Sequence, residues 1–142
     1  MFQLLLAAVL TFTPVATMQG TAGVQDGDGI ILNGVEVRMR GIAAPEDRGG
    51  PNTLGAAATR ALERLARGEQ VICFLDGSSA RGRPVGVCFA NNVDLNAEMV
   101  RLGFARDCPR FSGGEYADEE AEARAAGRNL SLSYRLPGYC GR

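Results

Sequence analysis

The sequence predicts an α+β fold in which five short strands form a small barrel and three helices pack around it. Two patterns carry this prediction. Short apolar or alternating runs are bounded by glycine, proline and asparagine, as strands are, and three longer stretches place apolar residues at helical spacing. With 142 residues the chain is long enough for one hydrophobic core, and no linker or internal repeat divides it.

The first three strands are predicted near the N-terminus. Residues 18–25 form a possible first strand, and residues 29–32 form a short apolar second strand. Asn33 and Gly34 follow as a two-residue hairpin turn, because both residue types tolerate positive φ. Apolar and charged side chains alternate in residues 35–42, which predicts a strand with one buried face and one solvent face.

The remaining elements follow from the same patterns and from capping residues. Asn52 or Thr53 can cap one helix, and Asp94 can cap another. A helix inserted after the third strand of a five-stranded sheet is typical of an OB-type barrel. In chain order we expect a helix at residues 54–67, strands at 71–75 and 84–90 joined by a polar loop at 76–82, a helix from Asp94 to about Leu102, an acidic helix at 115–126 and an irregular tail.

The composition excludes several classes of active site. All 15 basic residues are arginine, and the chain has no histidine, lysine or tryptophan. A Ser-His-Asp triad, a histidine-ligated zinc ion and a Schiff-base lysine are therefore excluded. The net charge of −1 gives no overall attraction to nucleic acid, so any anion site must be local. Catalysis would have to use carboxylates, arginines, thiols, hydroxyls or a metal ion held by oxygen.

The N-terminus has the pattern of a secretory signal peptide. Residues 4–12 are apolar apart from Thr11, a run too short to span a bilayer, and small residues follow. We expect the signal at residues 1–17 and one domain at 18–142, because a later cut after Ala22 would remove most of the first strand. This interpretation places the mature protein in the periplasm or outside the cell. A buried first strand and a misassigned start are the alternatives.

The four cysteines are expected to form two disulfides, since an even count behind an export signal favours oxidation. Cys73 and Cys88 lie on two strands joined by a short loop, which suits a cross-strand bridge. Cys108 and Cys140 would then pin the C-terminal tail, closing a loop of about 30 residues for roughly 3–4 kcal/mol in the chain-entropy model. The spacing favours this pairing without excluding others.

The residues that carry chemistry lie in three short stretches. An Asp-Gly-Asp turn ends at Asp28 and precedes a strand that carries Arg38 on its polar face. Glu46 follows directly after a proline that fixes its loop, and Arg83 stands between a glycine and a proline at the start of the last strand. Carboxylates and arginines in this arrangement suit an oxygen-ligated metal ion and a phosphate clamp.

In this order, the three stretches resemble the staphylococcal nuclease (thermonuclease) family. The match runs from about Val24 to Ala105, and the Cys-Pro-Arg and Leu-Pro-Gly-Tyr-Cys segments near the C-terminus resemble an exported bacterial subgroup. The resemblance implies a calcium-dependent phosphodiesterase on an OB-type barrel. Its substrates would be single-stranded or unwound DNA and RNA, and it would act as a monomer without membrane attachment once the signal is removed.

The resemblance also implies a role for individual residues. Asp28 matches a calcium ligand, and the backbone carbonyl of Ala44 can supply a second oxygen. Glu46 matches the general base that activates the attacking water, while Arg38 and Arg83 match the arginines that hold the scissile phosphate. A metal ion and two arginines can neutralise the charge of a phosphoryl transition state without histidine or lysine.

Three departures from the family pattern bear on activity. Ala43 stands where the family has a second calcium-ligating aspartate, which should weaken calcium binding because affinity depends on the number of charged ligands. Gly29 replaces a threonine, and Arg81 replaces a tyrosine that stacks on the nucleotide. Asp26 and Asp47 are candidate substitutes for the missing carboxylate.

These departures leave two other functions open. The chain could be a non-catalytic OB-type module that binds nucleic acid or another ligand with the remaining phosphate clamp. It could also be a disulfide-stabilised envelope protein that acts through protein contacts.

Overall fold

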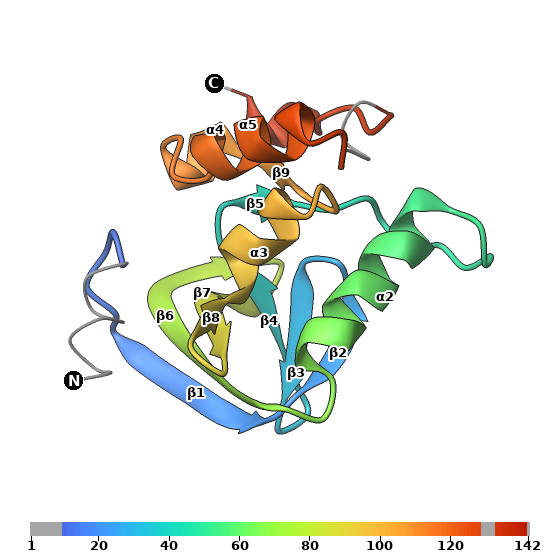
Figure 1. The fold of residues 1–142 in the computed structure, drawn as a ribbon. Helices are drawn as coiled ribbons and strands as arrows, with labels where there is room; N and C mark the ends of the chain where they lie inside the picture. The colour runs from blue at the N-terminus through green and yellow to red at the C-terminus, as the bar shows by residue number, and fades with distance from the viewer. Residues whose placement is uncertain (1–9, 129–132, 142) are drawn as a thin grey trace.

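The structure is an α+β fold in which helices α2 and α3 flank a bent sheet and α4 and α5 lie beyond one end of it (Figure 1). The computed structural model describes residues 10–128 and 133–141. The strands are β1 (Ala16–Thr21), β2 (Gly23–Asp26), β3 (Gly29–Leu32), β4 (Val35–Met39), β5 (Ile42–Ala43), β6 (Gln70–Ala80), β7 (Arg83–Ala90), β8 (Val93–Asp94) and β9 (Arg106–Asp107). The helices are α2 (Leu54–Ala66), α3 (Leu95–Arg101), α4 (Pro109–Ser112), α5 (Ala117–Ala125) and a 3₁₀ turn, η2 (Gly138–Cys140).

One bent segment supplies both edges of the main sheet. β1 pairs with β6 and β2 pairs with β3, although only Ala22 separates β1 from β2. The strand order is β1-β6-β7-β4-β3-β2, so the two ends of the sheet are consecutive in the chain and the sheet curls around the core (Figure 1). Among the described residues no hydrogen-bonded pairing joins β1 to β2. If β1 and β2 are counted as one bent strand, the sheet has the five long strands that the sequence predicts, and the α+β, OB-like class is confirmed.

The predicted polar loop at residues 76–82 is wrong. β6 continues to Ala80, and its end pairs with the start of β7, with Ala80 opposite Arg83. The turn is therefore only Arg81 and Gly82, both at positive φ. Serine, glycine and aspartate favour loops, but the backbone ladder resumes after an irregularity at Gly77, which has φ of +88°.

The predicted strand at residues 35–42 is interrupted. β4 ends at Met39, and Gly41 turns the chain with φ of +75°, so that Ile42 pairs with Asp107 in a separate small sheet. A Cβ at Gly41 would lie 2.9 Å from the Cβ of Ser112. This close approach to α4 explains why alternation alone could not show the break.

The three predicted helices are present, and the structure adds another, α4. Thr53 accepts a hydrogen bond from the backbone N–H of Ala56 at 3.0 Å, and Asp94 caps α3 in the same way. The third predicted helix begins at Ala117 rather than at residue 115, and α4 was not predicted. A proline at its first position and Gly113 in the left-handed region after it are sequence signals that could have revealed α4.

The core lies between the curled sheet and helices α2 and α3, and both predicted disulfides are confirmed. Cys73–Cys88 joins β6 to β7 inside the core, and Cys108–Cys140 joins the start of α4 to η2. Every helix in the part of the chain that the structure describes is too short or too polar to span a membrane. The predicted signal peptide falls largely on residues 1–9, which lie outside the described residues. The buried core residues include Ile30, Leu32, Val37, Met39, Ile42, Leu62, Val71, Leu95, Met99 and Val100.

Asp94 is expected to make stability depend on pH. Burial raises its pKa to about 6, against the lowering effect of the Ala97 N–H, with smaller raising effects from Glu115 and Glu119. The unfolded chain loses this proton near its ordinary pKa of 3.8, whereas the folded protein keeps it until about pH 6. The contribution of Asp94 to the free energy of unfolding therefore falls as the pH rises between these values.

The variant Asp94→Asn keeps a capping oxygen but does not ionise. Its unfolding free energy relative to the natural protein should rise from pH 4 to pH 7, by at most about 3 kcal/mol for a shift of roughly two pKa units. Urea titrations at both pH values measure this difference. A difference that is the same at both pH values would contradict the prediction.

Candidate functional site

The Asp-Gly-Asp turn between β2 and β3 packs tightly against two other elements. A Cβ at Gly27 would lie 2.6 Å from the Cβ of Ala58 in α2 and 2.7 Å from the Cβ of Ala44. Only glycine fits between them. The same turn presents the carboxylate of Asp28, which accepts a hydrogen bond from the backbone N–H of Ala44 at 2.9 Å. The turn thus holds the Asp28 carboxylate against the backbone N–H of Ala44, and the assignment of both residues as metal ligands stays a prediction.

Arg38, at the end of β4, is fixed beside this turn. Its side chain is only 13% exposed, and its Nη1 lies 3.4 Å from Oδ2 of Asp28. Nη1 also donates to the carbonyl of Met39 at 2.8 Å, and Nη2 donates to the carbonyl of Ile42 at 2.9 Å. Arg38 is therefore not on a solvated strand face. Its Nε makes no hydrogen bond to any described residue, which leaves one edge of the guanidinium for a ligand.

Asp26 adds a second carboxylate next to Asp28. Its Oδ1 accepts a hydrogen bond from the backbone N–H of Asp28 at 3.3 Å. Burial and, to a smaller extent, the negative charge of Asp28 together raise the pKa of Asp26 to about 6, while Arg38 opposes the shift. Of the two candidate substitutes for the missing aspartate, Asp26 is the one that lies within this cluster.

Glu46 pairs, through its carboxylate, with Arg48 and not with Arg38. Its side chain is 71% exposed, and its Oε2 pairs with Nη2 of Arg48 at 3.0 Å. The backbone of Glu46, by contrast, is held closely, because its carbonyl group packs against Gly55 at the start of α2. The structure thus fixes where this residue enters the site and leaves its carboxylate on the surface.

Arg83 lies on the strand beside Arg38 but has its own partner. β4 and β7 run parallel, with Arg38 opposite Val85, so Arg83 lies two residues closer to the start of β7, level with Glu36. Its Nη1 pairs with Oε2 of Glu36 at 2.9 Å, and its Nε donates to the carbonyl of Ala80. Arg81, where the sequence comparison expects a stacking tyrosine, is at the exposed hairpin tip.

Tyr134 belongs to the site, although sequence patterns did not indicate it. Its hydroxyl donates to the carbonyl of Ala44 at 3.1 Å, from 90 residues farther along the chain. The tail has no periodicity that would predict this contact. The predicted disulfide between Cys108 and Cys140 is the one signal that it returns to the domain.

The oxygen donors fit a calcium ion in kind but only weakly in number. The Asp28 carboxylate and the Ala44 carbonyl, which already accepts a hydrogen bond from Tyr134, are hard oxygen ligands of the type calcium prefers, and water would have to complete the shell. Among the described residues no group of three or more aspartate, glutamate, cysteine or histidine side chains could hold a metal ion. We therefore expect any calcium site here to be weak.

A family model described as staphylococcal nuclease homologue matches residues 36–131, about two thirds of the chain. The chain belongs to the staphylococcal nuclease family. Among its relatives, succinoglycan biosynthesis protein ExoI of Rhizobium meliloti (strain 1021) is 31% identical over 120 residues, which cover 78% of this chain and 63% of that protein. Probable staphylococcal-like nucleases CAN2 and CAN3 of Oryza sativa subsp. japonica are 33% and 32% identical over 107 residues.

This family member spans only part of those relatives. The matched region covers 75% of the chain but 28% of each rice protein, and less than two thirds of the Rhizobium protein. The comparisons therefore establish the nuclease-like domain and not the activity of a whole relative.

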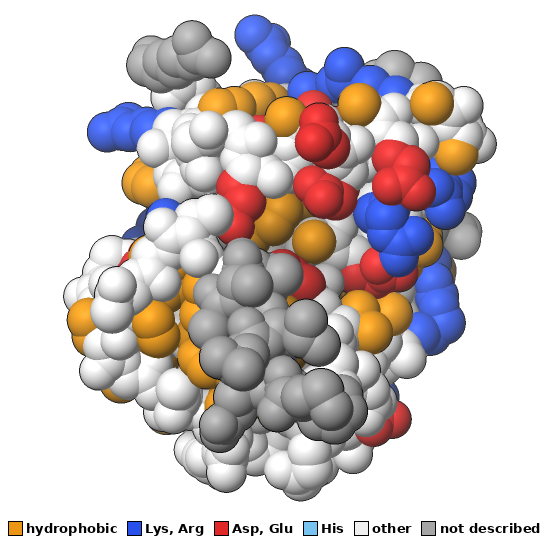
Figure 2. All heavy atoms as spheres, turned by 60° about the vertical axis from the view of Figure 1, so that its left-hand side comes forward, with side chains coloured by type: hydrophobic (Ala, Val, Ile, Leu, Met, Phe, Trp, Pro, Cys, Tyr) orange, Lys and Arg blue, Asp and Glu red, His pale blue; other side chains and the backbone are white. Residues whose placement is uncertain are grey.

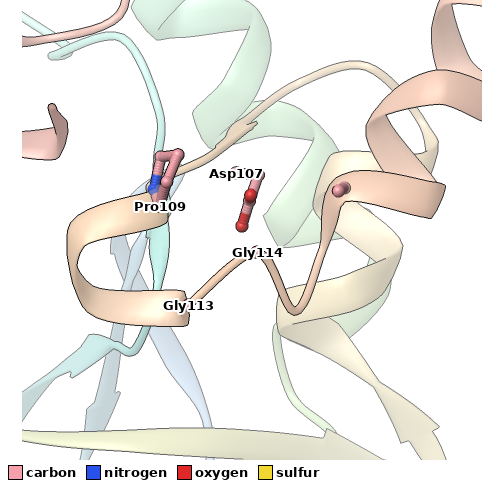
Figure 3. Close-up of a pocket in the computed structure, with 5 residues that line it drawn as sticks. Asp107, Pro109, Gly113 and Gly114 are labelled. Atoms are coloured by element: carbon pink, nitrogen blue, oxygen red, sulfur yellow. The ribbon is translucent and has the colours of Figure 1, made fainter. Parts of the chain in front are cut away.

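A hollow in this nuclease-like domain is lined by none of the residues around Asp28. It has a volume of about 370 Å³, and Figure 3 shows Asp107 beside the turn of Gly113 and Gly114 that follows α4. Oδ1 of Asp107 accepts hydrogen bonds from the hydroxyl of Ser112 at 2.5 Å and the N–H of Tyr116 at 3.3 Å. This carboxylate holds the turn between α4 and α5, so its burial has a structural explanation. The hollow is lined by Asp107, Pro109, Gly113, Gly114 and Ala117.

The charge distribution gives no broad surface for nucleic acid on the face shown in Figure 2. Acidic side chains and arginines are interspersed there among the described residues, without one continuous arginine surface. This agrees with the net charge of −1. Binding of a phosphodiester by this family member would rest on Arg38, which lies beside Asp28, and on Arg83, which is paired with Glu36.

Proposed function

We propose that the protein is an exported nuclease that hydrolyses phosphodiester bonds of DNA or RNA. Family membership supports nuclease chemistry in general. The observation that carries the proposal further is the placement of Arg38, whose guanidinium is fixed beside the carboxylate of Asp28 with its Nε edge left without a described partner. An immobilised cation beside an anionic oxygen ligand can bind a phosphate together with a metal ion.

Each residue of the candidate site would have its own role in phosphodiester hydrolysis. Arg38 would hold one phosphate oxygen, and Arg83 would leave Glu36 to hold another. Glu46 would exchange Arg48 for a water molecule and accept its proton as the water attacks phosphorus. The P–O bond to the leaving nucleoside oxygen breaks as the new bond forms, and that oxygen takes a proton from solvent water. A calcium ion held by Asp28 and the carbonyl of Ala44 would supply additional positive charge at the phosphate. None of these roles needs the missing histidine or lysine.

A second candidate function is a nucleic-acid-binding module without catalysis. It is favoured by the pairing of Glu46 with Arg48 on the surface and by the absence of a carboxylate at Ala43. In this case Arg38 and Arg83 would bind phosphate, but no base would activate water.

Export to the periplasm or the cell exterior is part of the proposal. Two disulfides support an oxidising location. Cleavage after Ala16 or Thr17 would keep the pairs from Met18 to Thr21 in β1, whereas cleavage after Ala22 would remove the whole strand from the edge of β6. We infer that the earlier cut is used and that the domain acts as a monomer; N-terminal sequencing and sedimentation of the exported product test both points.

The variant Glu46→Gln tests the catalytic proposal. The natural oxidised protein should cleave single-stranded DNA and RNA weakly, at calcium concentrations on the order of millimolar or above, as weak extracellular sites require. Glu46→Gln should lower the rate by roughly 10²–10⁴-fold, the usual contribution of a general base. Because Glu46 is exposed, the substitution should leave the unfolding midpoint unchanged. Gel assays over a calcium series measure the rates.

Glu63→Gln is the matched control, because Glu63 also forms a surface ion pair, with Arg67, on the outer face of α2. It should cleave as the natural protein does. If the natural protein binds the strands but cleaves neither at any calcium concentration, the binding-module function replaces the nuclease. If it neither binds nor cleaves, both functions are wrong and a role through protein contacts remains.

A further inference from the structure

The C-terminal tail covers the position where the family carries its second aspartate. The methyl group of Ala43 is fully buried in a small apolar cluster with Cys108 and Cys140, and Leu136 packs against the same cluster. The disulfide therefore packs against Ala43, next to Ala44 of the candidate site. A small residue at this position is what allows the tail to pack there.

The same tail brings Tyr134 back to the site. Its hydroxyl is 3.1 Å from the carbonyl oxygen of Ala44, the neighbour of the buried Ala43. Its own backbone carbonyl accepts a weak hydrogen bond from Nη1 of Arg106 at 3.5 Å, and Arg106 is itself held by Glu120. These contacts and the disulfide fix both ends of the segment that carries the ring.

The chemistry of the phenol suits an anion beside Arg38. The Tyr134 hydroxyl donates to the Ala44 carbonyl, the Ala44 N–H donates to Asp28, and Asp28 pairs with Arg38, so the ring lies beside the arginine that would bind phosphate. A phenol hydroxyl is a hydrogen-bond donor. A neutral donor adds a hydrogen bond to a phosphate oxygen without repelling a cation on Asp28.

We propose that Tyr134 contacts the phosphate of a nucleic-acid strand bound at Arg38, and that the Cys108–Cys140 disulfide holds it in that position. This inference rests on the proposed function, because it assigns a further phosphate contact to the same site. When a strand binds, the hydroxyl turns from the Ala44 carbonyl to a non-bridging phosphate oxygen. The tail thus supplies a substrate contact that the barrel itself lacks.

The test measures binding separately from cleavage. Fluorescence anisotropy of a labelled eight-nucleotide oligodeoxythymidylate, and of its RNA counterpart, is recorded in EDTA for the natural protein, Tyr134→Phe and Tyr134→Ala. A hydrogen bond to a charged oxygen predicts that Tyr134→Phe raises Kd about tenfold. The matched control is Tyr139→Phe, since Tyr139 lies in the same tail and is about half exposed; its Kd should stay within about twofold, the ordinary effect of a surface change.

Replacing both tail cysteines, Cys108→Ala with Cys140→Ala, should raise Kd to the same extent as Tyr134→Phe. A variant that carries all three substitutions should bind no more weakly than Tyr134→Phe alone. Steady-state cleavage should show the change in KM more than in kcat. Unchanged or tighter binding by Tyr134→Phe would overturn the inference, and tighter binding by Tyr134→Ala would show a tail that blocks the site. If the natural protein binds but does not cleave, the nuclease proposal fails while the Tyr134 result stands; if it does not bind, both fail.

Discussion

Gly55→Ala should destabilise the protein by about 3 kcal/mol and abolish cleavage, although the same change in an ordinary helix is stabilising. Gly55 is the second residue of α2, where alanine would normally gain up to about 1 kcal/mol. Here the new Cβ would lie 2.5 Å from the carbonyl carbon of Glu46 and 2.8 Å from Cα of Asp47, and it would overlap the Glu46 carbonyl oxygen. Because all these atoms are backbone, no side-chain rotation can relieve the overlap. The segment that carries Glu46 must therefore move away from α2.

Urea unfolding monitored by circular dichroism measures the stability, and the calcium-dependent gel assay measures the activity. Gly138→Ala is the matched control, because a Cβ there meets no atom within 4 Å and the backbone is not in the left-handed region. It should change the free energy of unfolding by less than about 0.5 kcal/mol. A Gly55→Ala protein as stable and as active as the natural one would contradict the close packing of the Glu46 segment on α2.

Removing the Cys73–Cys88 disulfide should lower the free energy of unfolding by about 3 kcal/mol or more. The chain-entropy model gives about 3 kcal/mol for its loop of 15 residues, and nearly 4 kcal/mol for the loop of 32 residues closed by Cys108–Cys140. From the structure we expect the reverse order. Cys73 on β6 and Cys88 on β7 belong to the main core cluster, so the double alanine variant also leaves a cavity there, whereas the equally buried Cys108 and Cys140 belong to a small separate cluster. The tail bridge holds a short peripheral segment that can detach without unfolding the barrel.

Thermal and urea unfolding of Cys73→Ala with Cys88→Ala, and of Cys108→Ala with Cys140→Ala, compare the two bridges directly. The tail variant should lose less than half as much stability as the core variant. A larger loss from the tail variant would show that the tail unfolds together with the barrel.

Local sequence patterns were enough for much of the fold because they reflect local physics. Helix α2 could be placed from its apolar spacing and the Thr53 cap, and the hairpin at Asn33 from residue types that tolerate positive φ. The break at Gly41 and the extension of β6 to Ala80 could not be placed in this way. They depend on contacts with α4 and β7, which are distant in the sequence.

For the candidate site too, the sequence identified some features and only the structure showed others. The resemblance to a known family pointed to Asp28 and Arg38, and the structure shows them 3.4 Å apart because β3, which follows the Asp28 turn, pairs with β4. Glu46 and Arg83 were identified with them, but in the structure each pairs with another charge, since side chains on surface segments follow their nearest partner. Their roles in the reaction stay predictions.

The sequence by itself determined which chemistries are excluded, which family the chain resembles and which cysteines could pair, because composition and short motifs carry that information. Only the tertiary structure decided what surrounds the missing aspartate. From the sequence, Ala43 is simply a lost ligand, and restoring aspartate would be expected to strengthen the metal site. In the fold Ala43 is buried against a disulfide, where a carboxylate would be desolvated, and the tail places Tyr134 beside the site. That arrangement depends on a bond between residues 32 positions apart, which no local pattern can position.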